Sequence, residues 1–244
     1  MNVKIPIIKY NIDPNTSVDV VRCDIIQWWF KRIIIDGIYC KSKQNNLVFA
    51  TNSSGTGALA LTLSLLKCKK NLIIFLSDSD VLSPNLSLCK DLWAKLDFSG
   101  KAKPFDSDSL RKEALEKYNN EIYEILPLGL ENEEVKFSMI NYLKTILDSY
   151  NPKEIWVVAA SWLTIRSLQE AFPKAKVHAV VVKDNNPKVG SAKVHKPKEY
   201  FREPAKILPP YTSNLYYDAK IWWIITEYNK KYKIENWTII FNIA

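Results

Sequence analysis

Short apolar runs alternate along this chain with longer segments in which apolar residues recur every three or four positions. Each run is bounded by turn-forming residues, a pattern typical of strands that alternate with helices. The runs are continuously apolar, which indicates strands buried on both faces of a sheet. We expect one mainly parallel sheet that contains four of them, namely Leu47–Thr51, Leu72–Leu76, Ile155–Ala160 and Lys176–Val182. Two shorter strands are expected at Ile122–Ile125 and Trp237–Phe241.

The segments between the runs carry helix-boundary residues. Ser83 before Pro84 predicts an N-cap followed by proline at the first helical position. Asp106 or Ser107 is expected to cap a helix that runs to Tyr118. The other expected helices are Thr56–Cys68, Asn85–Leu96, Glu131–Ser149, Ser161–Ala171 and Asn214–Tyr228. The pattern predicts a single α/β domain over residues 1–244, with a mainly parallel sheet and helices on both faces in three layers. Two small lobes are the alternative arrangement of the same elements.

Residues 183–213 break the alternation and are expected to form a long proline-rich basic loop. They hold five prolines, and seven lysines or arginines against three acidic residues. The whole chain has a formal net charge of +8. A solvated, ordered loop is the simplest interpretation. Binding of a phosphate group or of nucleic acid is the alternative, because basic runs attract both.

The cysteines and histidines give no metal-ligand pattern. The four cysteines are Cys23, Cys40, Cys68 and Cys89, and none forms a C-x-x-C pair. His178 and His195 lie far from them in the sequence, which argues against a zinc site. His178 lies inside an apolar run and is expected to be a core residue. Scattered cysteines without a secretory signal predict reduced core thiols in a cytoplasmic protein. No apolar stretch reaches the roughly 20 residues of a membrane span.

Two polar turns at strand-to-helix junctions are the candidate ligand sites, because ligands of open parallel sheets bind where strands end and helices begin. In the first turn, the backbone amides and the side chains of Asn52, Ser53, Ser54 and Thr56 would suit a carboxylate or phosphate. A plain N-capped turn explains the same residues. The second turn offers Ser161 and Thr164 as donors but contains no glycine. We expect both turns to face a shared cleft.

Three segments resemble those of the fold-type II pyridoxal-phosphate enzymes, which include the tryptophan synthase β-subunit, threonine synthase, aminocyclopropane-carboxylate deaminase and cysteine desulfhydrase. Asn52–Cys68 is similar to the family's substrate-carboxylate turn and its helix. Ile125–Leu130 resembles its proline-glycine turn before a long helix. Glu154–Ser161 resembles the strand that enters its phosphate-binding loop. The likeness covers residues 20–182 by the order of elements.

The resemblance implies a pyridoxal-phosphate enzyme that acts on a small amino acid by elimination or deamination, in the manner of a lyase. Lys41 or Lys43 would hold the cofactor as an imine. The first turn would hold the substrate carboxylate, and Ser161 and Thr164 would meet the cofactor phosphate. For the assembly, the sequence leaves a homodimer as an open alternative.

Two departures from the family support a rival interpretation. The positions that match its glycine-rich phosphate turn are Ala160–Leu163 here, and the segment between Lys43 and Asn52 is shorter than in the family. Only glycine lets backbone amides approach a phosphate so closely. The rival is a non-catalytic descendant of the fold with a binding or assembly role, and the third alternative is the phosphate or nucleic-acid binder above.

Overall fold

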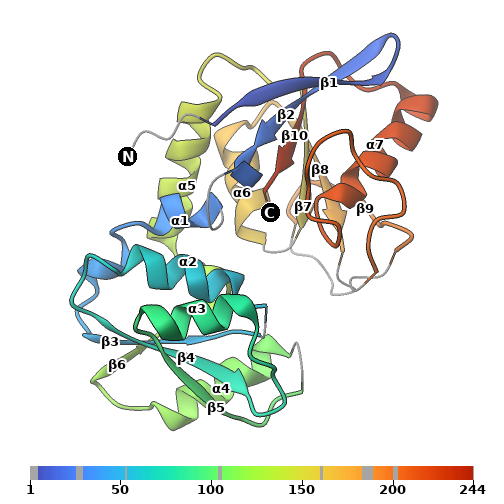
Figure 1. Cartoon of the computed structure of the whole chain (residues 1–244). Coiled ribbons are helices and arrows are strands. Elements are labelled where there is room, and N and C mark those ends of the chain that lie inside the picture. The colour runs from blue at the N-terminus through green and yellow to red at the C-terminus, as the bar shows by residue number, and fades with distance from the viewer. Residues whose placement is uncertain are drawn as a thin grey trace. The chain divides into compact units, whose positions relative to one another are not determined.

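The computed structural model describes residues 5–25, 30–52, 54–103, 106–159, 162–182, 189–199 and 203–243. The chain divides into two compact units (Figure 1). Unit 1 comprises Met1–Phe30 and Lys136–Ala244, and unit 2 comprises Lys31–Val135. Each unit is built around its own sheet and is described by itself.

Unit 2 contains a four-stranded sheet in the order β5-β4-β3-β6, and every neighbouring pair is parallel. Helices cover both of its faces, with α2 and α3 on one side and α4 on the other (Figure 1). The strands are β3 (Asn46–Ala50), β4 (Asn71–Ser77), β5 (Lys95–Gly100) and β6 (Tyr123–Ile125). The helices are α1 (Phe30–Ile35), α2 (Thr56–Ser64), α3 (Pro84–Leu92) and α4 (Ser107–Lys117), with the 3-10 turns η2 (Tyr39–Lys41) and η3 (Leu128–Leu130).

Unit 1 contains a six-stranded sheet in the order β1-β2-β10-β7-β8-β9. The β1–β2 hairpin is antiparallel, and all other neighbouring pairs are parallel. The strands are β1 (Ile7–Asp13), β2 (Thr16–Arg22), β7 (Glu154–Ala159), β8 (Lys176–Val181), β9 (Lys193–His195) and β10 (Thr238–Asn242). The helices are η1 (Cys23–Ile25), α5 (Glu133–Ile146), α6 (Trp162–Ala171) and α7 (Ala219–Tyr232), and α5 begins in unit 2.

Local capping explains where α3 and α4 of unit 2 begin. The Ser83 hydroxyl accepts a hydrogen bond from the Leu86 amide, and Pro84 takes the first helical position, as expected. Asp106 is the cap of α4 and accepts from the Ser109 amide. Each cap satisfies an amide that has no partner within its helix.

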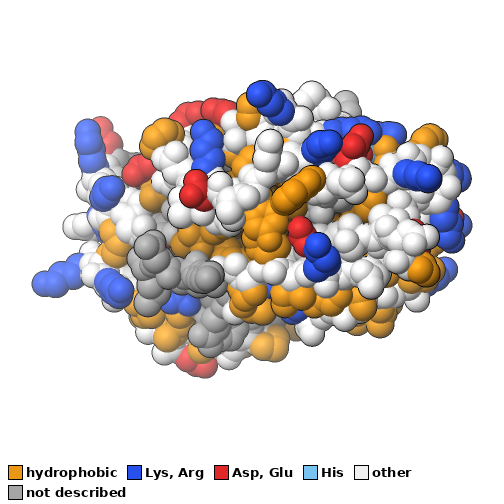
Figure 2. Space-filling model, turned by 90° about the horizontal axis from the view of Figure 1, so that it is seen from above, with side chains coloured by type: hydrophobic (Ala, Val, Ile, Leu, Met, Phe, Trp, Pro, Cys, Tyr) orange, Lys and Arg blue, Asp and Glu red, His pale blue; other side chains and the backbone are white. Residues whose placement is uncertain are grey.

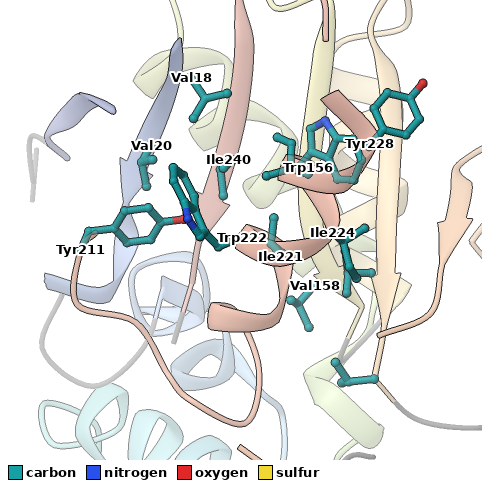
Figure 3. Close-up of a cluster of buried hydrophobic side chains, with 13 residues drawn as sticks. Val18, Val20, Trp156, Val158, Tyr211, Ile221, Trp222, Ile224, Tyr228 and Ile240 are labelled. Carbon is teal, nitrogen blue, oxygen red and sulfur yellow. The ribbon is translucent and has the colours of Figure 1, made fainter. Parts of the chain in front are cut away.

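The two units have different cores. In unit 1, the α7 side of the sheet is filled by large side chains (Figure 3), among them Trp156, Trp222, Tyr211 and Tyr228. The core of unit 2 under α4 uses smaller residues with few rings: Val48, Ala50, Ile73, Phe75, Ala102, Leu110, Ala114 and Tyr118. Aromatic side chains bury more area each, so the unit 1 layer gains more of its burial from individual rings.

The α/β class, the mainly parallel sheets and the helices on both faces confirm the predicted fold class. The expectation of one sheet with all four runs is wrong, because β3 and β4 lie in one sheet and β7 and β8 in the other. The alternation of strands and helices is the same in one sheet or two, so the pattern cannot distinguish them. The pattern also missed the β1–β2 hairpin, and it assigned the start of β5 to the preceding helix, which ends at Leu92.

The cysteines correct a second expectation. Cys23 and Cys89 are free and buried, as predicted for core thiols. Cys40 and Cys68 instead form a disulfide and are only half-buried. The two lie 28 residues apart, so their pairing depends on the tertiary fold. Within the residues that the structure describes, every helix is too short or too polar to span a lipid bilayer.

Candidate functional site

Each sheet has a point at which the strand order reverses, and such points are where open α/β sheets bind ligands. In unit 2, the chain proceeds from β3 outward to β4 and β5, and then returns to place β6 on the other side of β3. The carboxyl ends of β3 and β6 therefore flank the reversal. The turn that begins at Asn52 follows β3, and Pro127 with η3 follows β6. Two of the three segments that resemble the enzyme family thus meet at this point.

Hydrogen bonds and close packing constrain the described residues of the turn that begins at Asn52. The Asn52 carbonyl oxygen Oδ1 accepts from the Ser54 amide at 3.1 Å and from the Ser54 hydroxyl at 2.6 Å. Gly55 has a φ of +65°, and a Cβ there would lie 2.9 Å from Leu86 Cγ. The Asn85 side-chain amide donates to the Ser54 carbonyl at 2.9 Å. Only glycine satisfies both the positive φ and the close approach of α3.

This turn presents donors to an anion. It leads into the N-terminus of α2, whose first turn carries no acidic residue, and amides at such a terminus favour a carboxylate or phosphate. Thr56 is exposed at the first helical position, and Ser54 is also exposed. Ser53 lies outside the described residues. The hollow beside Asn52 that unit 2 encloses measures 10 Å³, about the space for a single water molecule.

In unit 1 the reversal lies between β7 and β10. The chain proceeds from β7 to β8 and β9, while β10 lies on the opposite side of β7. The turn after β7 is the second candidate turn, and Ala160 and Ser161 within it lie outside the described residues. Thr164 lies in the first turn of α6 and is buried, with 5% of its surface exposed. The role of Ser161 and Thr164 at a phosphate, and a cleft shared by the two turns, stay predictions.

The two lysines expected to hold the cofactor lie on the surface of unit 2. The Lys41 side chain is 77% exposed, and its Nζ lies 3.7 Å from Glu134 Oε1. Lys43 is exposed as well. Lys70, which directly precedes β4, donates to the carbonyl of Ser42 at 2.6 Å and that of Gln44 at 2.9 Å. These bonds hold the lysine-bearing segment near the amino ends of the strands, whereas the Asn52 turn lies at their carboxyl ends.

An imine needs an amine positioned at the cofactor aldehyde. Lys41 and Lys43 do not fit that requirement in the positions that the structure gives them, so we derive no reaction step through the cofactor. Their assignment as imine-forming residues stays a prediction.

Sequence reasoning did not single out Lys220, the one lysine that is buried among the described residues, with 1% of its surface exposed. It lies in the first turn of α7. Burial lowers its pKa, and the charges of Glu199 and Glu203 oppose that shift. A desolvated lysine is neutral more often than a surface lysine and is a better nucleophile. Helical spacing could have found it, because Lys220 lies three residues after Tyr217 and four before Ile224 on the apolar side of the expected helix.

Both histidines belong to one network in unit 1, in which His178 is buried and His195 is half-buried. His178 Nδ1 lies 2.9 Å from His195 Nε2, and His178 Nε2 lies 3.5 Å from Glu154 Oε1. The Trp156 ring stacks on His178, with centroids 4.1 Å apart. Glu154 opens β7, so the network lies at the amino ends of the strands and away from the reversal. His178 is fully buried, which confirms the core role predicted for it.

Comparison with known proteins gives likenesses in structure alone. No protein-family model matches the sequence, and no curated protein matches it. An ACC deaminase homologue matches 98% of this chain and 88% of its own, with a TM-score of 0.76 and 12% identity. A hydrogen sulfide-producing enzyme from Fusobacterium nucleatum matches 98% and 85%, with a TM-score of 0.71 and 14% identity.

O-ureido-L-serine synthase matches 98% of this chain and 87% of its own, with a TM-score of 0.68 and 13% identity. The chain has the fold of the fold-type II pyridoxal-phosphate enzymes. At 12–14% identity, the likeness extends to the fold and not to the activity of these proteins.

Proposed function

We propose that this chain is a pyridoxal-phosphate-dependent enzyme that acts on a small amino acid by elimination or deamination. The observation that carries the proposal is the likeness over 98% of the chain to an ACC deaminase homologue, with O-ureido-L-serine synthase and a hydrogen sulfide-producing enzyme beside it. The match includes both units, so the whole fold supports the proposal. The proposal keeps the cytoplasmic location and the homodimer expected from the sequence.

The turn after β3 would bind the substrate carboxylate. Asn52, Ser53, Ser54 and Thr56 carry the donors, and Gly55 allows the α2 amides to point toward the same ligand. Ser161 and Thr164 would bind the cofactor phosphate. Pyridoxal phosphate would supply the electron sink that elimination or deamination requires.

A non-catalytic descendant of the fold is the second candidate, and the exposure of Lys41 and Lys43 favours it. Relaxed catalytic constraint would leave an intact fold without a positioned lysine. Such a protein would still bind a small carboxylate or phosphate at the first turn.

The basic loop gives less support to a nucleic-acid binder. Lys193 Nζ lies 4.7 Å from the ring centroid of Tyr228, and Lys198 Nζ lies 4.7 Å from that of Trp223. These cation–π contacts use the two charges to hold the loop against α7. On the face in Figure 2, Lys and Arg side chains are spread among hydrophobic ones and do not form one basic patch.

The deciding experiment is to add pyridoxal phosphate to the purified chain, record its visible absorbance, and reduce the mixture with borohydride. Reduction fixes any imine on its lysine, and peptide mapping by mass spectrometry then identifies that lysine. The proposed enzyme gives an absorbing imine and turnover with a small amino acid. If the fold is intact and no lysine forms an imine, the enzyme proposal is wrong and the non-catalytic candidate replaces it.

Two variants test which lysine forms the imine. Lys41→Ala with Lys43→Ala abolishes the imine if either surface lysine holds the cofactor. Lys220→Met keeps an apolar stem in the buried position and abolishes the imine if the buried lysine holds it. Circular dichroism of both variants checks that the fold is retained. If the double variant retains absorbance and turnover, neither Lys41 nor Lys43 forms the imine.

A further inference from the structure

The disulfide joins two segments of unit 2 that have no other covalent link nearby. Cys40 lies in η2, and Cys68 lies just beyond the end of α2. Their Cα atoms are 5.5 Å apart, within the range of about 4.4–6.8 Å that disulfides require. Both residues are half-buried, so each has part of its surface in contact with solvent.

The remaining cysteines provide an internal contrast. Cys23 and Cys89 each have 0% of their surface exposed. Burial raises the pKa of both thiols, and that of Cys23 most. The thiolate is the reactive form, so buried thiols of this kind are inert. The chain therefore has one accessible pair and two protected thiols.

The surroundings of the pair are those of reactive cysteines. Lys67 and Lys69 flank Cys68 and are exposed, and exposed Lys41 follows Cys40. Reactive thiols in proteins lie in partly exposed, positively charged surroundings. Both sulfurs also lie 3.9 Å from the Ser64 carbonyl oxygen, at the last turn of α2. Both sulfurs therefore lie beside the same turn of α2, where one small molecule can reach either of them.

We propose that Cys40 and Cys68 are a site of reversible thiol–disulfide exchange with low-molecular-weight disulfides of the glutathione class. In the oxidising direction, one cysteine thiolate attacks glutathione disulfide, forms a mixed disulfide and releases one glutathione thiolate. The second cysteine thiolate attacks the mixed disulfide at the protein sulfur and releases the second glutathione. Two electrons pass from the protein sulfurs to glutathione, and the two cysteine protons end on the released thiols.

The exchange would control how firmly η2 is attached to α2. When the disulfide is present, the covalent bond and the Lys70 contacts with Ser42 and Gln44 all hold the segment that precedes β3. When it is reduced, the Lys70 contacts hold that segment without a covalent bond. In cytoplasmic proteins, disulfides are usually transient or redox-sensing, which agrees with an accessible pair of this kind. Neither exchange step uses pyridoxal phosphate, so this site can be tested whatever the outcome for the cofactor.

The test is to equilibrate the full chain at a series of ratios of reduced to oxidised glutathione and to trap thiols by alkylation. Mass spectrometry of the peptides then reports each cysteine separately. Cys40 and Cys68 are expected to pass together and reversibly between alkylated and disulfide forms. Cys23 and Cys89 should become alkylated only after denaturation. If the pair stays a disulfide at every ratio, or stays reduced at every ratio, the proposal is wrong.

Single variants separate exchange from a static cross-link. In Cys40→Ser, the remaining Cys68 should gain one glutathione from the oxidised mixture, and Cys68→Ser should do the same at Cys40. The oxidised parent should melt about 5–10 °C above the reduced parent, and both variants should lose that difference. Cys89→Ala is the matched control and should keep it. Variants that fold but never take up glutathione would overturn the proposal.

Discussion

Units 1 and 2 are built by the same alternation of strands and helices but place their chemically active side chains differently. Unit 1 buries His178, Glu154 and several aromatic rings within or beside its sheet, and it half-buries His195. Unit 2 keeps its accessible cysteines and the lysines of its first segment near the surface. A buried titratable group makes stability depend on pH, whereas an exposed thiol makes it depend on redox conditions. The units should therefore respond to different conditions.

The largest expected effect is in the aromatic core of unit 1. Trp156 is the largest fully buried side chain among the described residues, and its ring lies 5.2 Å from that of Tyr228 as well as against His178. Trp156→Ala should lower the free energy of unfolding by about 3–5 kcal/mol, because the cavity cannot fully collapse. Urea denaturation followed by circular dichroism measures this, and Trp156→Phe should cost less than half as much. A loss below about 1 kcal/mol would show that the unit 1 core tolerates large cavities.

The corresponding test in unit 2 adds one carbon atom at a glycine, whereas Trp156→Ala removes a whole ring system. A Cβ at Gly100 would lie 2.4 Å from Leu110 Cδ1 and 2.8 Å from the Leu76 carbonyl oxygen. Gly100→Ala should therefore cost about 1–3 kcal/mol through overpacking. Gly37→Ala is the control, since a Cβ there meets nothing within 4 Å and only its φ of +78° is strained. Equal losses for the two variants would contradict tight packing at Gly100.

Acid should weaken unit 1 before unit 2. Burial first, and then the charges of His178, Lys193 and Lys176, lower the pKa of His195 to about 4, and burial also lowers the pKa of His178. Glu154 opposes both shifts. The folded state thus binds fewer protons than the unfolded state between pH 6.5 and about 4, so stability is full above pH 6.5 and falls as pH drops through this window. The loss should be about 1–2 kcal/mol after allowing for the partial exposure of His195.

Hydrogen exchange measured by mass spectrometry at several pH values tests this difference between the units. Protection of β8 and β9 should fall over the window, while protection of β3 and β4 changes less. His195→Gln should make the protection of β8 and β9 depend less on pH, because the glutamine side chain does not titrate. An unchanged pH profile in that variant would remove His195 as the cause.

The smallest effect is expected for the surface charges of unit 2. Lys41 pairs with Glu134 at 3.7 Å, and both side chains are more than half exposed. Such pairs contribute little, so Lys41→Ala with Lys43→Ala should change the free energy of unfolding by no more than about 0.5 kcal/mol. Urea denaturation checks this. A larger loss would mean that the segment is structurally important, and the double variant could then not test imine formation without a stability correction.

Much of the fold could be predicted because its elements are defined by neighbours in the sequence. The predicted runs correspond to β3, β4, β6, β7, β8 and β10 within one or two residues at either end. Ser83 and Asp106 cap their helices as expected, since a cap needs only a side chain three residues from its amide. The hairpin of β1 and β2 was missed because polar residues interrupt the apolar ones along both seven-residue strands, and β1 is partly exposed at the edge of the sheet.

The candidate site could be predicted only in part. The turn after β3 was identified by its polar residues and glycines, and the sheet order places it at a reversal point. The positions of Lys41 and Lys43 could not be known, because the exposure of a lysine depends on what packs around its segment. The buried position of Lys220 could have been predicted from its helical spacing, because it shares a face with Ile221 and Ile224.

The sequence by itself determined the strands, the helices, their caps and the parallel α/β class. These follow from hydrophobic periodicity and local hydrogen bonding, which act over a few residues. The tertiary structure alone decided that the strands form two sheets, that Cys40 meets Cys68, and that His178 meets His195. His178 and His195 are 17 positions apart in the sequence, and Cys40 and Cys68 are 28 apart. These contacts depend on how whole elements pack, and no local pattern encodes that packing.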